Sequence, residues 1–165
     1  NKINSSNETI VDFLKENGLD ENEITVNAPE IVDMNAERYS SNQSNYRYNV
    51  TQVITVASSK VDLVRRLINE QSELLKQGIA ITGGDYMYRV KYEYNDLNSI
   101  KPQMIEEATK NARTAAQKFA SDSDSKLGKI KRASQGQFSI SDRDEFTPYI
   151  KKVRVVTTID YFLED

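Results

Sequence analysis

The stretch from Glu106 to Gly136, EEATKNARTAAQKFASDSDSKLGKIKRASQG, joins an alanine-rich segment to a polar break and then to a basic, strand-like segment. Alanine has the highest helix propensity and leaves one helix face without side-chain bulk. Its recurrence therefore predicts a helix, from about Ser99 to Ser121, that lies closer than usual to a sheet. The alanines are Ala108, Ala112, Ala115, Ala116 and Ala120.

The expected helix has a start signal and one apolar side. Ser99 is a candidate N-cap, and Pro102 suits the first turn. The side chains expected to line one side are Met104, Ile105, Ala108, Ala112, Ala115, Phe119 and Ala120. After the polar break the chain must turn sharply into the next strand at Gly128. We expect a positive φ there, which glycine adopts at little steric cost.

The polar break does not complete a calcium or a phosphate loop. Counted from Asp122, the fifth and twelfth positions of a calcium loop are Lys126 and Ala133, which supply no carboxylate. Gly128 and Lys129 lack the upstream glycine and the Ser or Thr of a phosphate-binding loop. A packing helix, a turn and a strand is the favoured interpretation.

Periodicities elsewhere predict further helices and strands. Capping-box spacing of Ser5 and Glu8 predicts a helix that Gly18 ends, with Leu19 folding back onto it. Later elements are a hairpin of 23–34 and 46–58, interrupted at Pro29; a helix over 58–77 ended by Gly78; a strand over 81–96; and extended segments at 128–141 and 150–164. This order predicts an α+β fold, with a mainly antiparallel sheet and about three helices packed on one face, in a single domain over residues 1–165.

The strand expected over 81–96 is unusually rich in tyrosine. Because side chains alternate between the two faces of a strand, Tyr86, Tyr88, Tyr92 and Tyr94 are expected on the same face. Tyrosine is enriched at protein interfaces, so this face is a candidate interaction surface. The alternative is that it is the core side of the sheet, with the hydroxyl groups reaching the rim.

Composition excludes several kinds of chemistry. The chain has no His and no Cys, which excludes a Ser-His-Asp triad, thiol catalysis, disulfides and imidazole or thiolate metal sites. We accordingly expect no cofactor and no metal. The net charge of −3 gives no basic excess for general nucleic-acid binding. Apolar runs stay well short of the roughly 18 residues that span a membrane.

Carboxylates remain as candidate catalytic groups. Two carboxylates can divide acid and base roles when their environments separate their pKa values. The candidates for a hydrolase are Asp142, Asp144 and Glu145, or else Glu106 and Glu107. The first set is expected in a loop and the second near a helix start, where acidic residues are common for structural reasons.

A basic segment raises nucleic-acid binding as a further alternative. Its residues are Lys126, Lys129, Lys131 and Arg132, with Phe138 nearby. Basic residues that alternate with apolar ones along a strand more often form a solvated face. The excess of acidic over basic residues in the whole chain also opposes binding to phosphates. We therefore expect no nucleic acid among the partners.

The helix, break and strand together resemble the SIMPL domain family, which is also catalogued as a domain of unknown function. The family pattern has spaced alanines, an Ala-Arg pair and a following Leu or Phe, then Lys-Leu-Gly-Lys before a strand. It falls here on Ala108, Ala112, Arg113, Ala116, Phe119, Ala120, Lys126, Leu127, Gly128, Lys129 and Ile130. The segments FLKENGLDENEITV, YRYNVTQVITV and VRVVTTIDYFL resemble other parts of the family, so the resemblance covers most of the chain.

The chain departs from the family pattern in two places. Many members have glycine where Asp124 or Ser125 stands here. The family domain also usually begins with another strand, after a signal or membrane anchor. The resemblance therefore leads us to expect that the natural N-terminal strand and any signal or anchor are missing from this sequence.

The resemblance implies a bacterial protein of the periplasm or cell envelope without established enzymatic activity. Some members are linked to oxidative-stress defence and others to self-assembly. We therefore expect a non-enzymatic envelope protein that forms a homo-oligomer or binds a protein partner. Contact with a membrane would come only through a segment absent from this chain.

Overall fold

The computed structural model describes residues 2–36, 47–82 and 89–165. The chain divides into two compact units, unit 1 (Asn1–Asp85) and unit 2 (Tyr86–Asp165). Both contain helices and antiparallel strand pairs, which confirms the mixed α+β class. The single domain expected over residues 1–165 stays a prediction.

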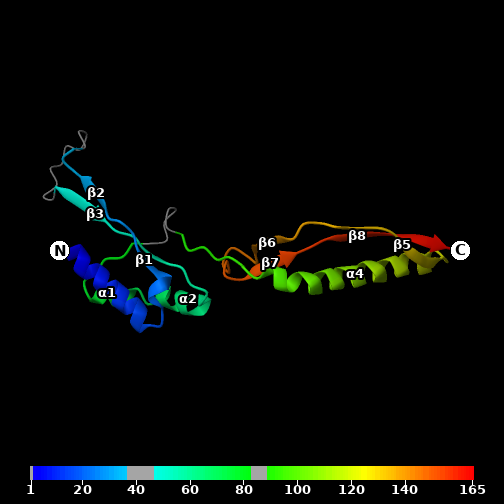
Figure 1. Cartoon of the computed structure of the whole chain (residues 1–165), viewed down its shortest axis with the longest axis horizontal. Coiled ribbons are helices and arrows are strands. Elements are labelled where there is room, and N and C mark those ends of the chain that lie inside the picture. The colour runs from blue at the N-terminus through cyan, green and yellow to red at the C-terminus, as the bar shows by residue number, and fades with distance from the viewer. Residues whose placement is uncertain (1, 37–46, 83–88) are drawn as a thin grey trace. The chain divides into compact units, whose positions relative to one another are not determined.

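Unit 1 contains four short strands and three α-helices (Figure 1). Its strands form two antiparallel pairs, β1 with β4 and β2 with β3, as the predicted hairpin requires. Pro29 lies between β1 and β2, where an interruption was expected. The elements are α1 (Lys2–Glu16), the 3-10 helix η1 (Glu21–Glu23), β1 (Ile24–Val26), β2 (Glu30–Asp33), β3 (Tyr48–Thr51), β4 (Ile54–Val56), α2 (Val61–Asn69) and α3 (Ser72–Lys76).

The buried core of unit 1 is small and aliphatic. Two leucines come from α2 and α3, and two further apolar residues come from the turns that end α1 and α3. These core residues are Leu19, Leu67, Leu74 and Ile79. Since each turn residue lies directly after a helix-ending glycine, helix termination and core formation are linked in this unit.

Unit 2 consists of one long helix and two strand pairs (Figure 1). α4 (Leu97–Asp122) packs on β8 (Thr157–Glu164) and β5 (Lys126–Gln135), which pair with each other antiparallel. β6 (Ser139–Asp142) pairs with β7 (Lys151–Arg154). The helix spans the expected 99–121 region but begins at Leu97, so Pro102 lies beyond the first turn.

The alanine face of α4 is partly as predicted. Ala108, Ala112 and Ala116 are half-buried and Ala120 is only 2% exposed, so alanines spaced by four residues face the sheet. The prediction was wrong for Ala115 and Phe119, which are exposed. In a helix with 3.6 residues per turn, position 119 lies about 100° around the axis from position 120, which places Phe119 on the flank.

The strand expected over 81–96 is not formed in its described part. Residues 89–96 belong to no strand, although Tyr92 and Tyr94 are half-buried while Lys91 and Glu93 are exposed. The period-two alternation is therefore present without a paired neighbour, and pairing is what defines a strand. Tyr86 and Tyr88 lie outside the described residues.

Three helices end in the same backbone motif, in which one residue has a positive φ. Gly18 and Gly78 fill that position after α1 and α3, with φ of 109° and 80°, which confirms both as helix-ending residues. After α4 the position is filled by Asp124, with a φ of 56°. The amide of Ser125 donates to the carbonyl of Ala120 at 2.9 Å, as the motif requires.

Replacing Asp124 with glycine is expected to raise the free energy of unfolding by about 1 kcal/mol, because a left-handed conformation is costly for residues with a Cβ. Urea denaturation measures the change. Ser123→Gly is the matched control, because Ser123 has an ordinary φ of −100°. It should not stabilise the protein, and equal gains from both variants would contradict the explanation.

Candidate functional site

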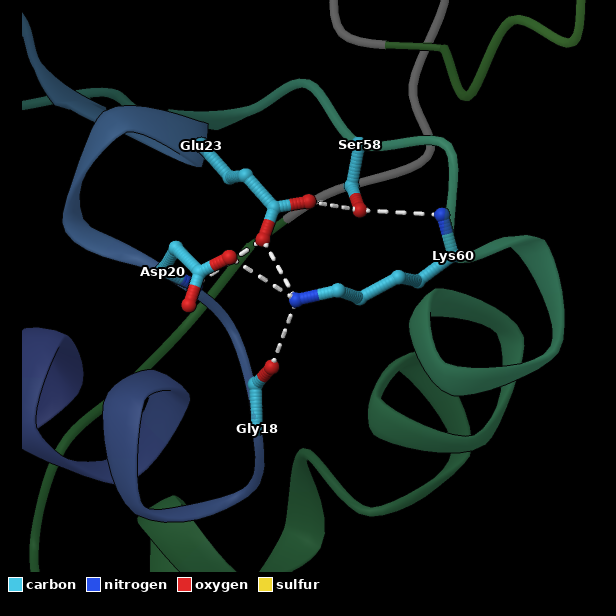
Figure 2. Close-up of polar contacts among 5 residues, drawn as sticks. All are labelled: Gly18, Asp20, Glu23, Ser58 and Lys60. Atoms are coloured by element: carbon cyan, nitrogen blue, oxygen red, sulfur yellow. Dashed lines mark hydrogen bonds and ion pairs between the residues drawn. The ribbon is translucent and has the colours of Figure 1, made fainter.

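A dense group of polar contacts joins the end of α1 to the start of α2 (Figure 2). The Nζ of Lys60 donates to the Gly18 carbonyl at 3.0 Å, to Asp20 Oδ2 at 3.1 Å and to Glu23 Oε1 at 2.9 Å. The Ser58 hydroxyl donates to Glu23 Oε2. We call these five residues the Lys60 cluster. It forms because Gly18 turns the chain at the end of α1 and η1 then presents Glu23 toward the loop before α2.

The contacts of the cluster stabilise its charged forms. The Ser58 hydroxyl, the Asp20 amide and Lys60 lower the pKa of Glu23 to about 2. Glu23 and Asp20 raise the pKa of Lys60 above its usual value. The Glu23 side chain is 12% exposed, so its carboxylate has lost most of its water and relies on these donors instead.

The cluster contains a serine and a lysine but is not arranged for nucleophilic catalysis. A Ser-Lys pair needs a neutral lysine that takes the serine proton. Lys60 is instead held as a cation by two carboxylates, and the Ser58 hydroxyl points at Glu23. The low pKa of Glu23 also makes it a weak base. The arrangement fits a structural link between two loops.

Sequence reasoning missed this cluster because its partners are far apart in the chain. Glu23 accepts a hydrogen bond from the amide of Asp20 at 2.9 Å, and the spacing of these two acids is a capping-box signal. Lys60 lies 37 residues beyond Glu23. Nothing in the local pattern around Lys60 distinguishes it from other surface lysines.

The Lys60 cluster predicts a specific response to acid. A carboxylate whose pKa is depressed on folding contributes stability above its unfolded pKa, and that contribution is lost as the pH falls through the folded pKa. For Glu23 this window runs from its ordinary pKa of 4.5 down to about 2. Wild type should be more stable than Glu23→Gln at pH 6, and the difference should shrink as the pH falls from 4.5 toward 2.

Urea denaturation midpoints between pH 2 and pH 6 measure this difference. The control is Glu21→Gln, since Glu21 is an exposed neighbour whose ion pair with Lys15 is loose, at 3.6 Å. Its midpoints should follow those of wild type. A constant gap between wild type and Glu23→Gln over the whole pH range would contradict the assignment.

The residues of the family pattern are divided between packed and exposed positions. Leu127 pairs with Leu163 of β8, and the register shifts between Leu127 and Ile130. Arg113 and Lys129 are exposed. Nothing in these positions brings reactive groups together.

Gly128 is needed for a different reason from the one expected. The positive-φ glycines of the described chain are Gly18 and Gly78, so the prediction of a positive φ at Gly128 was wrong. A Cβ at Gly128 would lie 2.8 Å from the carbonyl oxygen of Phe162 and 3.2 Å from its Cβ. The glycine therefore permits close approach of β5 to the β8 backbone at the register shift.

The two described tyrosines of the candidate interaction surface border a shallow cleft of about 360 Å³. The Tyr92 ring packs edge-on against Tyr149, with centroids 6.0 Å apart. The cleft is lined by Tyr92, Glu93, Tyr94, Asn95, Ile140, Ser141, Asp142 and Lys151. One wall consists of residues 92–95 and the other of residues 140–142. Because side chains alternate in direction along an extended segment, backbone atoms as well as side chains line the cleft.

The candidate catalytic carboxylates are engaged in local contacts. Asp142 pairs with Lys151 across β6 and β7. Asp144 accepts the amides of Phe146 and Thr147, each at 2.9 Å, and the Thr147 hydroxyl at 2.6 Å; the last contact is the main cause of its lowered pKa. This pattern is a turn cap within the loop, and Glu145 lies exposed inside it.

The second carboxylate pair also forms part of the surface. Glu106 bonds Lys110 one helical turn later at 2.5 Å, which lowers the pKa of Glu106, and Glu107 is exposed. No group of three or more His, Cys, Asp and Glu able to hold a metal occurs among the described residues. The described helices include none long and apolar enough to span a bilayer.

The basic segment forms the exposed part of β5. Lys126, Lys129 and Lys131 are exposed, and Arg132 pairs with Asp160 of β8 at 3.3 Å. Phe138 lies outside this strand, with the Lys101 ammonium 5.3 Å from its ring centroid. The cation described next to the Phe138 ring therefore belongs to α4.

Comparison with known families gives a match over most of the chain, whereas a search of curated proteins found none. The matching family model is SIMPL, described as a protein of unknown function (DUF541), and it covers residues 1–156. The match spans α4, β5 and the β6–β7 pair as well as unit 1. The chain therefore belongs to the SIMPL family, whose function is unknown.

Proposed function

We propose that this chain is a non-enzymatic envelope protein that acts through self-association or, as the broader form of the proposal, through a protein partner. The observation that carries the proposal is how little of unit 2 is buried. Among the described residues of unit 2, Ala120 alone is a buried hydrophobic residue, and several large apolar side chains are exposed. The latter include Phe119, Ile130, Phe146, Phe162 and Leu163.

Apolar surface contributes to stability only when it is removed from water. A second copy or a protein partner that covered these side chains would supply that stabilisation. Phe146 is 86% exposed at the tip of the β6–β7 loop. The hydrogen bonds of Asp144 hold that loop in place, so the ring is presented on an ordered turn.

The enzymatic alternative is a hydrolase that uses Asp142, Asp144 and Glu145. The ion pair of Asp142 and the turn cap at Asp144 favour structural roles for these groups. Screening hydrolase substrates with wild type and with Asp142→Asn and Asp144→Asn tests the alternative. A turnover that both substitutions abolish would replace the proposal.

The location in the periplasm or envelope and a role in oxidative-stress defence are parts of the proposal that rest on family membership. Fractionation of cells that express the full-length gene tests the first, with the protein expected in the envelope fraction. Survival of a deletion strain under peroxide tests the second. A protein found in the cytoplasmic fraction would contradict the envelope location. Unchanged survival under peroxide would contradict the role in oxidative-stress defence.

Self-association is tested by light scattering over a hundredfold range of protein concentration. The monomer has a mass of 18.8 kDa. The proposal predicts a weight-average mass above this value that rises with concentration. A constant mass of one chain over the whole range would contradict self-association.

A further inference from the structure

The β5–β8 pair leaves two long strand edges open. Within the described part of the chain, β5 pairs with β8 and with no third strand. β5 has ten residues and β8 has eight, so each edge presents a row of outward backbone amides and carbonyls. Such an edge is a template for pairing with another chain.

The two edges carry opposite charge. β5 has four cations and no anion, whereas β8 has two anions, Asp160 and Glu164, and no cation. Arg132 and Asp160 pair across the two strands, and the Lys131 ammonium lies 5.8 Å from the centroid of the Phe162 ring. The remaining lysines of β5 and Glu164 form no ion pair among the described contacts.

The charges decide which edges can meet. Two β5 edges would place lysines against lysines, and two β8 edges would oppose their acidic groups; like charges directly across a sheet are destabilising. A β8 edge against a β5 edge places opposite charges together. The lysines thus disfavour pairing of two β5 edges and favour pairing of a β5 edge with a β8 edge. Specific interfaces often combine such repulsion and attraction.

We infer that the β8 edge of one copy pairs with the β5 edge of a second copy, a conclusion that rests on the self-association proposed above. β8 runs antiparallel to β5 within a copy, so a neighbour in the same orientation continues an antiparallel sheet. The contact joins two different surfaces and repeats from copy to copy, which gives a ring or an open filament.

The helix layer fits this repeat. Each copy adds two strands, or about 9.5 Å of sheet width, while packed helices lie about 8–10 Å apart. α4 lies along one face of its own strand pair (Figure 1). Neighbouring α4 helices would therefore pack side by side, with Phe119 on the flank. That contact accounts for a phenylalanine that is 74% exposed in one copy.

Complementary charge reversal tests this contact in the full chain. One variant makes the β5 edge acidic with Lys129→Glu and Lys131→Glu, and the other makes the β8 edge basic with Thr158→Lys and Glu164→Lys, so that the ion pair of Arg132 and Asp160 within each copy is kept. Sedimentation velocity should show self-association at least about tenfold weaker for each variant alone. An equimolar mixture should associate as wild type does, because each acidic edge then meets a basic one.

The control carries three reversals of exposed cations outside β5, Lys91→Glu, Lys152→Glu and Arg154→Glu, and should associate as wild type does. Circular dichroism checks that every variant is folded. Phe119→Ser, at a position where folding does not require the ring, should also weaken association about tenfold.

The outcomes separate the two proposals. A wild type that stays monomeric removes self-association itself. A wild type that associates while the charge variants or Phe119→Ser associate equally well overturns the β8-to-β5 contact alone. A mixture of folded charge variants that stays monomeric overturns it as well.

Discussion

Leu74→Ala is expected to lower the free energy of unfolding of unit 1 by about 2–5 kcal/mol. Leu74 is 2% exposed and is the largest fully buried side chain among the described residues. Removing a buried leucine costs the transfer free energy of its atoms and leaves a cavity that the surroundings fill only in part. In a core with so few buried residues, that loss is a large share of the stability.

The neighbouring leucine of the same helix supplies the control. Leu75 is 65% exposed, so Leu75→Ala removes the same atoms from a position already in water. Amide hydrogen exchange reports the two units separately. Faster exchange in unit 1 is expected for Leu74→Ala and little change for Leu75→Ala. Equal effects of the two variants would contradict the location of the core.

Ala120→Leu is expected to destabilise unit 2 by about 1–3 kcal/mol. Ala120 is 2% exposed in the last turn of α4, where the helix lies on β5 and β8. Extra carbon atoms in a filled contact force neighbouring side chains or the backbone to shift. Exchange of the α4 and β8 amides should become faster, with the amides of unit 1 unaffected.

Ala115→Leu is the matched control in the same helix. Ala115 is exposed, and leucine has nearly the helix propensity of alanine, so the stability should change by about 0.5 kcal/mol or less. A similar loss for both variants would mean that the packed face of α4 has been assigned wrongly.

Local signals predicted much of the fold. Gly18 and Gly78 end helices because the positive φ that each adopts is a property of a single residue. The antiparallel pairing in unit 1 and the sheet-facing positions of Ala108, Ala112, Ala116 and Ala120 follow from periodicity. Phe119 was placed wrongly because a residue three positions after Ala116 can lie at the edge of the packed face of a helix. The sheet under α4 is only two strands wide and does not cover that edge.

The predictions that were wrong concern features that depend on residues distant in the chain. The strand pattern through Tyr92 and Tyr94 lacks a paired neighbour, and propensity alone cannot supply one. Gly128 was correctly identified as a special position, but its reason is the nearby carbonyl of Phe162, which no local pattern reveals. The contacts of Lys60 were missed for the same cause.

Hydrogen exchange of β5 and β8 at low and high protein concentration tests whether copies of the chain associate through these strand edges. The informative amides are those that point away from the partner strand, because one copy alone leaves them open to water. We expect these amides to exchange fast in dilute solution and to become protected at high concentration, together with the α4 flank around Phe119. Equally fast exchange of these amides at both concentrations would contradict association through the strand edges.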